Sequence, residues 1–149
     1  MPDFPLSTEL VGSFRTLARA IRTDGVDSAV RANWLLHPLI ASAHALPDQR
    51  GRVEAMVLAF PAGEYLAVSR DAPDRDWTVI ERLSSIAVPT LVVSGERDLP
   101  DFIAMASLVA ERVPNCALEV LPACGHLVPL EQPAALSAAL VEFLGSLAG

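Results

Sequence analysis

The hydrophobic pattern of the second half of the chain alternates between two periods. Residues 88–95 form a short aliphatic run, VPTLVVSG, which predicts a strand buried on both faces and parallel to its neighbours. Residues 101–113 carry apolar side chains three and four positions apart, which predicts a helix. A second short strand is predicted at 116–121, and a final helix that opens at 131–133, EQP. Strand, helix, strand, helix at this spacing is a βαβα unit with a right-handed crossover, so the predicted fold class is α/β.

The first eighty residues follow the helical period only. Apolar positions predict helices over residues 8–22, 27–36 and 50–60, separated by prolines, and no run of strand quality occurs among them. We therefore expect a helical segment at 1–80, followed by the βαβα portion at 81–149.

The composition is unusually apolar for a protein that stays in solution without a partner. Of its 149 residues 52% are hydrophobic and 19% charged, with a mean hydropathy of +0.39. No uninterrupted apolar run approaches about 18 residues, so we expect no membrane span. The opening MPDFPLSTEL has no basic residues before an apolar run, which does not fit a signal peptide. We expect a cytoplasmic protein whose surface has a partner.

The net charge and the cysteine content exclude several classes of partner and bound group. The net charge is −7, and no cluster of Lys or Arg is evident along the sequence, which argues against nucleic acid or an anionic membrane as partner. Cys116 and Cys124 are too few for a disulfide scaffold and have no metal-ligand spacing with any histidine. We expect reduced thiols, with no metal site and no cofactor.

Two polar residues follow the carboxyl ends of the predicted strands, where binding and catalytic sites lie in parallel α/β sheets. Asp98 comes just after the first strand, in GERD, and His126 just after the second, in CGH. Loops that leave adjacent parallel strands can place a carboxylate beside an imidazole, which fixes the tautomer and leaves the other nitrogen as a general base. Gly125 is expected to allow a sharp turn there. Asp101 is the competing acid, which we interpret as a helix N-cap.

Three segments together resemble the last third of the α/β-hydrolase superfamily, in the branch of small esterases, enol-lactonases and carbon–carbon bond hydrolases. They are PTLVVSGERD at 89–98, LVAERVP at 108–114 and CGHLVPLEQP at 124–133. The resemblance covers about residues 82–147 and implies that Asp98 is the acid and His126 the base of a catalytic triad. Residues 1–80 resemble, more loosely, the helical lid of such enzymes. In that lid Trp34, Leu35 and Leu39 would line the substrate pocket, the alternative being plain helical packing.

The nucleophile of that family is missing from the sequence. It sits at the centre of a Gly-x-Ser-x-Gly turn, but only Gly145 and Gly149 are four apart here, and Leu147 lies between them. Moreover, two parallel strands are not a stable sheet by themselves, so the first strand is expected to have an open edge. We expect a part of a larger sheet, completed by the missing N-terminal half or by self-association.

Two main hypotheses follow. In the first, the chain is the C-terminal half of a hydrolase for an ester, lactone or related small-molecule carbonyl substrate, active once a serine is supplied from elsewhere. In the second, it is a noncatalytic remnant that binds a partner through its lid and open sheet edge. A third possibility is water activated by His126 alone. If the chain contains an unrecognised nucleophile, Ser94 and Ser13 are the first candidates.

Overall fold

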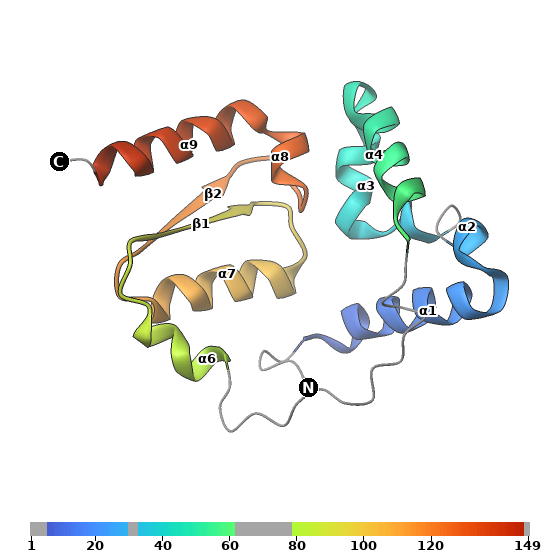
Figure 1. Cartoon of the computed structure of the whole chain (residues 1–149), viewed down its shortest axis with the longest axis horizontal. Coiled ribbons are helices and arrows are strands. Elements are labelled where there is room, and N and C mark those ends of the chain that lie inside the picture. The colour runs from blue at the N-terminus through green and yellow to red at the C-terminus, as the bar shows by residue number, and fades with distance from the viewer. Residues whose placement is uncertain (1–5, 30–32, 62–78, 148–149) are drawn as a thin grey trace. The chain divides into compact units, whose positions relative to one another are not determined.

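The computed structural model describes residues 6–29, 33–61 and 79–147 (Figure 1). The described residues form two compact units, the first within residues 6–61 and the second within residues 79–147. No helix among these residues is both long and apolar enough to cross a membrane.

The described part of the first unit is helical. It contains α1 (Thr8–Asp24), α2 (Val26–Ala29), α3 (Pro38–Ala45) and α4 (Pro47–Ala59). The side chain of Ser7 caps α1 by accepting a hydrogen bond from the Leu10 N–H at 3.1 Å, and α1 ends at Gly25, whose φ of 84° suits glycine. The helices predicted at 8–22 and 50–60 correspond to α1 and α4.

Two helices of this unit differ from the prediction. Of the helix expected over 27–36, the described residues form the single turn of α2 and a π-helical turn at 33–34, and residues 30–32 lie outside the described part of the chain. Helix α3 was not predicted, because Pro38 was interpreted as a breaker. Pro38 is instead the first residue of α3 and Pro47 the first of α4, a position where a helix needs no N–H and the fixed φ of proline is favourable.

The second unit has the predicted α/β order. The turns α6 (Val79–Arg82) and η2 (Leu83–Ser85) lead into β1 (Thr90–Gly95), α7 (Pro100–Arg112) and β2 (Cys116–Leu121). The short helix α8 (Val128–Glu131), which was not predicted, and α9 (Pro133–Ser146) follow. The strands are parallel, with Thr90 opposite Cys116 and Gly95 opposite Leu121. Figure 1 shows α7 on one side of the two strands and α9 on the other.

The sheet is less buried than the sequence predicted. The first four residues of β1 are half-buried, and residues 117–120 of β2 are exposed, with 36% of Leu118 and 48% of Val120 accessible. The reason is that only two strands are paired in the described part of the chain, with one long helix on each side. Burial is concentrated at the carboxyl ends of the strands, where Leu121, Cys124 and Val128 form a small core.

Candidate active site

The carboxyl ends of β1 and β2 bring Asp98 and His126 together. The His126 Nδ1 lies 2.9 Å from one oxygen of the Asp98 carboxylate and 3.0 Å from the other. The Asp98 side chain is 8% exposed and the imidazole 30%. An oxygen of Asp98 also accepts the backbone N–H of Leu99 at 2.7 Å. The structure therefore joins the two residues that the sequence singled out, while their catalytic role stays a prediction.

The contact with Asp98 decides which nitrogen of His126 carries the proton. An ionised carboxylate can only accept hydrogen bonds, so Nδ1 is the donor and Nε2 is left as the acceptor of the neutral ring. The Phe102 ring, on α7, lies against the imidazole with its centroid 4.5 Å away and the planes tilted by 51°. Among the described residues no hydrogen bond to Nε2 is found, and the role of this nitrogen as a base stays a prediction.

A hollow of about 290 Å³ opens beside the Asp98–His126 pair. Its walls are the last residues of β1, 92–95, and one side of α7, and its lining is mostly apolar. The residues of α7 that line it are Phe102, Met105, Ala106 and Val109. A small substrate group or a further segment of backbone could occupy such a space.

The loop that carries His126 approaches the end of β1 very closely. A Cβ added to Gly95 would lie 2.7 Å from the carbonyl carbon of Cys124, and closer still to the carbonyl oxygens of Cys124 and Gly125. Only glycine fits there. The left-handed residue of the loop is Ala123, with φ of 55°, whereas the sequence had suggested a sharp turn at Gly125.

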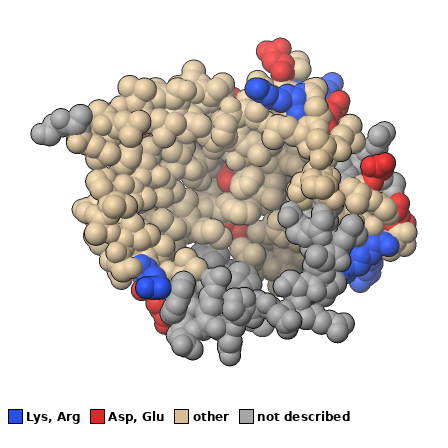
Figure 2. Space-filling view, in the orientation of Figure 1, with Lys and Arg blue, Asp and Glu red and all other residues tan. Residues whose placement is uncertain are grey.

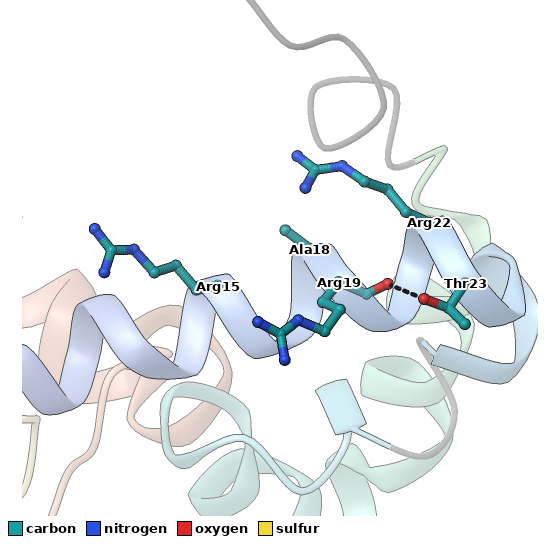
Figure 3. A pocket seen from close by; sticks show the side chains of 5 residues that line it. All are labelled: Arg15, Ala18, Arg19, Arg22 and Thr23. Carbon is teal, nitrogen blue, oxygen red and sulfur yellow. Dashed lines mark hydrogen bonds between the residues drawn. The ribbon is translucent and has the colours of Figure 1, made fainter.

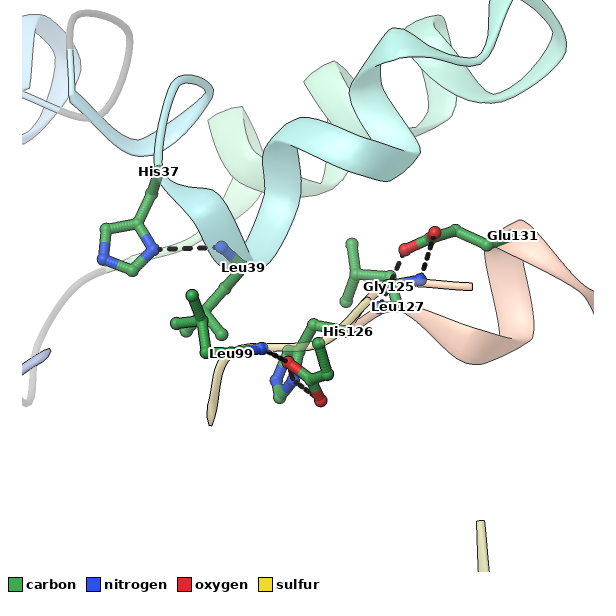
Figure 4. A network of polar contacts seen from close by, with 8 residues as sticks. His37, Leu39, Leu99, Gly125, His126, Leu127 and Glu131 are labelled. Atoms are coloured by element: carbon green, nitrogen blue, oxygen red, sulfur yellow. Dashed lines mark hydrogen bonds and ion pairs between the residues drawn. The ribbon is translucent and has the colours of Figure 1, made fainter. Parts of the chain in front are cut away.

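Two carboxylates that the sequence analysis did not single out hold this loop, and Figure 4 shows the second of them, Glu131. Glu96 accepts the Ala123 N–H at 2.8 Å. Glu131 accepts the Gly125 N–H at 2.7 Å with one oxygen and the Leu127 N–H at 3.1 Å with the other. A signal for Glu131 was present, because a glutamate in the first turn of a helix often reaches back to the N–H at the helix start.

The N-cap predicted at Asp101 is wrong. Helix α7 begins at Pro100, its N-cap is Leu99, and no side chain caps it. Asp101 is the second residue of the helix, because Pro100 takes the first position with its fixed φ. An acidic residue in the first turn still interacts favourably with the helix dipole.

The three residues predicted to line the substrate pocket as part of a lid all lie in the described part of the first unit. Trp34 is half-buried, packs against the buried pair Leu17 and Ile21, and its ring lies 5.1 Å from that of His37. Leu39 is 6% exposed, and Leu35 is half-buried. A role in lining a substrate pocket stays a prediction for all three.

The first unit contains a serine–histidine pair, Ser13 and His37, with Oγ 2.9 Å from Nε2. His37 caps α3, because its Nδ1 accepts the Leu39 N–H at 3.3 Å (Figure 4). Nε2 must therefore carry the proton of the neutral ring, and it donates to Ser13 Oγ, which itself donates to the Leu10 carbonyl at 2.8 Å. A nitrogen that donates cannot take the serine proton, so this arrangement is structural.

Ser94 and Cys124 lie near the Asp98–His126 pair, and neither has the surroundings of an activated nucleophile. Ser94 is 6% exposed in β1, and no hydrogen bond links its hydroxyl to His126 in the described part of the chain. Burial, and then the charges of Glu131 and Asp98, raise the pKa of the Cys124 thiol above its ordinary value. Within the described ranges, no group of three His, Cys, Asp or Glu side chains could hold a metal ion.

A row of arginines that the linear sequence did not reveal lies on α1. Arg15, Arg19 and Arg22 surround a hollow of about 460 Å³ (Figure 3). They are separated in the sequence, but spacings of four and three residues bring them onto one stripe of a helix. The expectation of no basic cluster is therefore wrong for this helix.

Comparison with known proteins places this chain in a family. No family model matches the chain. A Bacillus subtilis protein assigned as a 2-succinyl-6-hydroxy-2,4-cyclohexadiene-1-carboxylate synthase is 30% identical over 139 residues, which are 89% of this chain and 48% of that protein. The solved structure of MenH from S. aureus superposes with a TM-score of 0.73 and 25% identity, over 92% of this chain and 51% of that one. The chain belongs to the α/β-hydrolase superfamily.

A thermophilic esterase from Thermogutta terrifontis shows the same relation. Its structure matches with a TM-score of 0.68 and 26% identity, over 95% of this chain and 52% of that one. The chain thus spans about half the length of these relatives, and it corresponds to the C-terminal portion of the superfamily fold.

Proposed function

We propose that this chain supplies the acid and the base of a serine hydrolase acting on an ester, lactone or related carbonyl substrate. One observation carries the proposal: Asp98 holds the Nδ1–H of His126 at 2.9 Å, beside an apolar hollow. This is the arrangement in which Nε2 can act as a general base. Trp34, Leu35 and Leu39 are proposed to shape the pocket as part of a lid.

The proposed reaction needs an activated serine, and the described part of the chain does not show one. Nε2 of His126 takes the proton from the serine hydroxyl while the serine oxygen forms a bond to the substrate carbonyl carbon. The imidazolium, stabilised by Asp98, then gives the proton to the leaving oxygen as the bond between that oxygen and the carbonyl carbon breaks. Water, deprotonated in the same way, releases the acid product and frees the serine.

A further segment of sheet is the proposed source of that serine. In the described part of the chain β1 has a strand neighbour on one edge only, and the hollow runs along residues 92–95 of this strand. Unpaired backbone groups on a strand edge are a template for another strand. The relatives are about twice as long as the matched portion, which supports a complementing N-terminal portion.

A chimera tests the proposal. The N-terminal portion of the Thermogutta terrifontis esterase is joined to residues 1–149 at the boundary of their structural match. Turnover of p-nitrophenyl butyrate and labelling by a fluorophosphonate probe are then measured. The chimera should turn over the ester and bind the probe at its elbow serine, whereas the 149-residue chain alone should do neither. A folded chimera that lacks both properties would contradict the proposal.

A second candidate function, a noncatalytic interaction module, is favoured by the exposed apolar surface. Val141 is 70% and Leu144 61% exposed on α9, and Val120 is 48% exposed on β2. Figure 2 shows few charged side chains over the part of the surface that α9 and the sheet form. Sedimentation of the wild type and of Val141→Asp tests this candidate, because self-association through α9 would be weakened by the buried charge.

A further inference from the structure

The Glu131 carboxylate bridges two backbone donors on either side of His126. Its Oε2 accepts the Gly125 N–H at 2.7 Å, and its Oε1 accepts the Leu127 N–H at 3.1 Å (Figure 4). Hydrogen bonds to an ionised carboxylate are shorter and about twice as strong as neutral ones. One side chain therefore holds the Cys124–Gly125 peptide group before His126 and the His126–Leu127 peptide group after it.

Helix capping explains only one of these bonds. Leu127 is the N-cap of α8, and Glu131, the fourth residue of the helix, reaches back to the N-cap N–H much as the glutamate at the third position does in a capping box. Gly125 lies two residues before that cap and outside the helix. The second bond therefore orders the loop, and His126 is the only residue between the two donors.

The contacts around the loop hold the His126 imidazole against Asp98. The imidazole must meet Asp98, which comes from the loop after the other strand, and it does so at 2.9 Å. The loop is tied to that strand end by the Arg97 N–H, which donates to the Cys124 carbonyl at 2.8 Å. Glu131 holds the same Cys124–Gly125 peptide group by its N–H, and it also holds the outgoing side of the loop by the Leu127 N–H. His126 is thus held from both directions while its ring stays available.

We infer that Glu131 is a positioning residue that holds the His126 loop so that the imidazole keeps its hydrogen bond to Asp98. Its catalytic consequence rests on the proposed function. No hydrogen bond joins its carboxylate to the imidazole among the described residues, so it acts through the backbone. The field of Glu131 does reach the loop, because it helps to raise the pKa of the neighbouring Cys124 thiol.

The direct test is nuclear magnetic resonance on the full 149-residue chain. The readouts are exchange with water of the His126 Nδ1 proton and of the Gly125 and Leu127 amides. In Glu131→Ala these protons should exchange about tenfold to a hundredfold faster, as expected for the loss of charge-assisted hydrogen bonds. Glu131→Gln should be intermediate, because its one amide oxygen can replace one of the two acceptors.

Glu142→Ala is the matched control, since it removes the same charge from an exposed position of α9 in the same unit. Exchange of the Nδ1 proton in Glu131→Ala at the rate seen in Glu142→Ala would overturn the inference. If Glu131→Ala does not fold, the exchange rate of the Nδ1 proton is compared between Glu131→Gln and the wild type, and equal rates would overturn the inference. Wild-type Gly125 and Leu127 amides that exchange as fast as unprotected amides would also overturn it.

Activity of the chimera separates this inference from the proposed function. Glu131→Ala should lower kcat by about a hundredfold with KM nearly unchanged, because the imidazole of His126 is misplaced while the substrate pocket keeps its shape. Glu131→Gln should restore part of that loss. If His126→Ala leaves turnover intact, the proposed function fails, and the exchange measurements still decide whether Glu131 positions His126.

Discussion

Replacing Gly95 by alanine probes the contact on which the site depends. Gly95 ends β1, and the loop that carries His126 lies directly against its backbone. The new Cβ would lie 2.7 Å from the Cys124 carbonyl carbon, where ordinary contact begins at 3.4 Å. The two backbone segments must therefore separate by about 0.7 Å or more, and neither segment has a flexible side chain there that could yield.

The energetic cost follows from this separation. Forced overpacking costs about 1–3 kcal/mol. Two backbone hydrogen bonds cross the same contact, from the Glu96 N–H to Leu121 at 2.9 Å and from the Arg97 N–H to Cys124 at 2.8 Å, and each contributes about 0.5–1.5 kcal/mol. We expect Gly95→Ala to lower the free energy of unfolding of the second unit by about 2–6 kcal/mol, a large share of the stability of any domain.

The assay is urea unfolding followed by circular dichroism, with Gly145→Ala as the matched control. Nothing lies within 4 Å of a Cβ at Gly145, which is part of α9. Alanine is the better helix former, so this control should be neutral or raise the free energy of unfolding by up to about 1 kcal/mol. Equal unfolding midpoints for Gly95→Ala and the wild type would refute the reasoning.

Three further predictions concern the same loop and its partner. Asp98→Asn should lower kcat of the chimera by about 10⁴-fold, because the amide no longer favours the Nδ1–H tautomer of His126; a loss under tenfold would contradict the assigned tautomer. Because burial raises the pKa of Cys124 above the ordinary 9.0, the unfolded chain releases its thiol proton first. The free energy of unfolding should therefore fall as pH rises past about 9, more steeply than in Cys124→Ala; equal slopes would refute this. Ala123→Gly should raise the free energy of unfolding by about 0.5–1 kcal/mol, because φ of 55° strains alanine more than glycine; a lower unfolding midpoint would count against it.

The sequence predicted the α/β unit well because its signals are local. The bounds of β2 match the prediction, since a short apolar run between two prolines has few alternatives. The pairing of Asp98 with His126 also followed from topology, because adjacent parallel strands end at the same edge. Helices α3 and α8 were missed, as both begin with or contain proline in their first turn.

Other features depend on contacts that the sequence pattern does not encode. The need for glycine at position 95 comes from a backbone 29 residues later in the chain, at Cys124. The exposure of β2 reflects what is packed beside the strand, whereas its apolar residues alone predict burial. The link from Glu131 to Gly125 spans a loop whose path is set by tertiary hydrogen bonds.

The central claim is that His126, oriented by Asp98, is the general base of a hydrolase. It is tested most directly by ester turnover of the chimera with and without His126→Ala, with His44→Ala as control. His44 is paired with Glu54 in the first unit, at 3.0 Å. We predict that His126→Ala lowers kcat by at least about 10³-fold, with folding unchanged and with His44→Ala near the wild-type rate. Turnover retained in a folded His126→Ala chimera would contradict the claim.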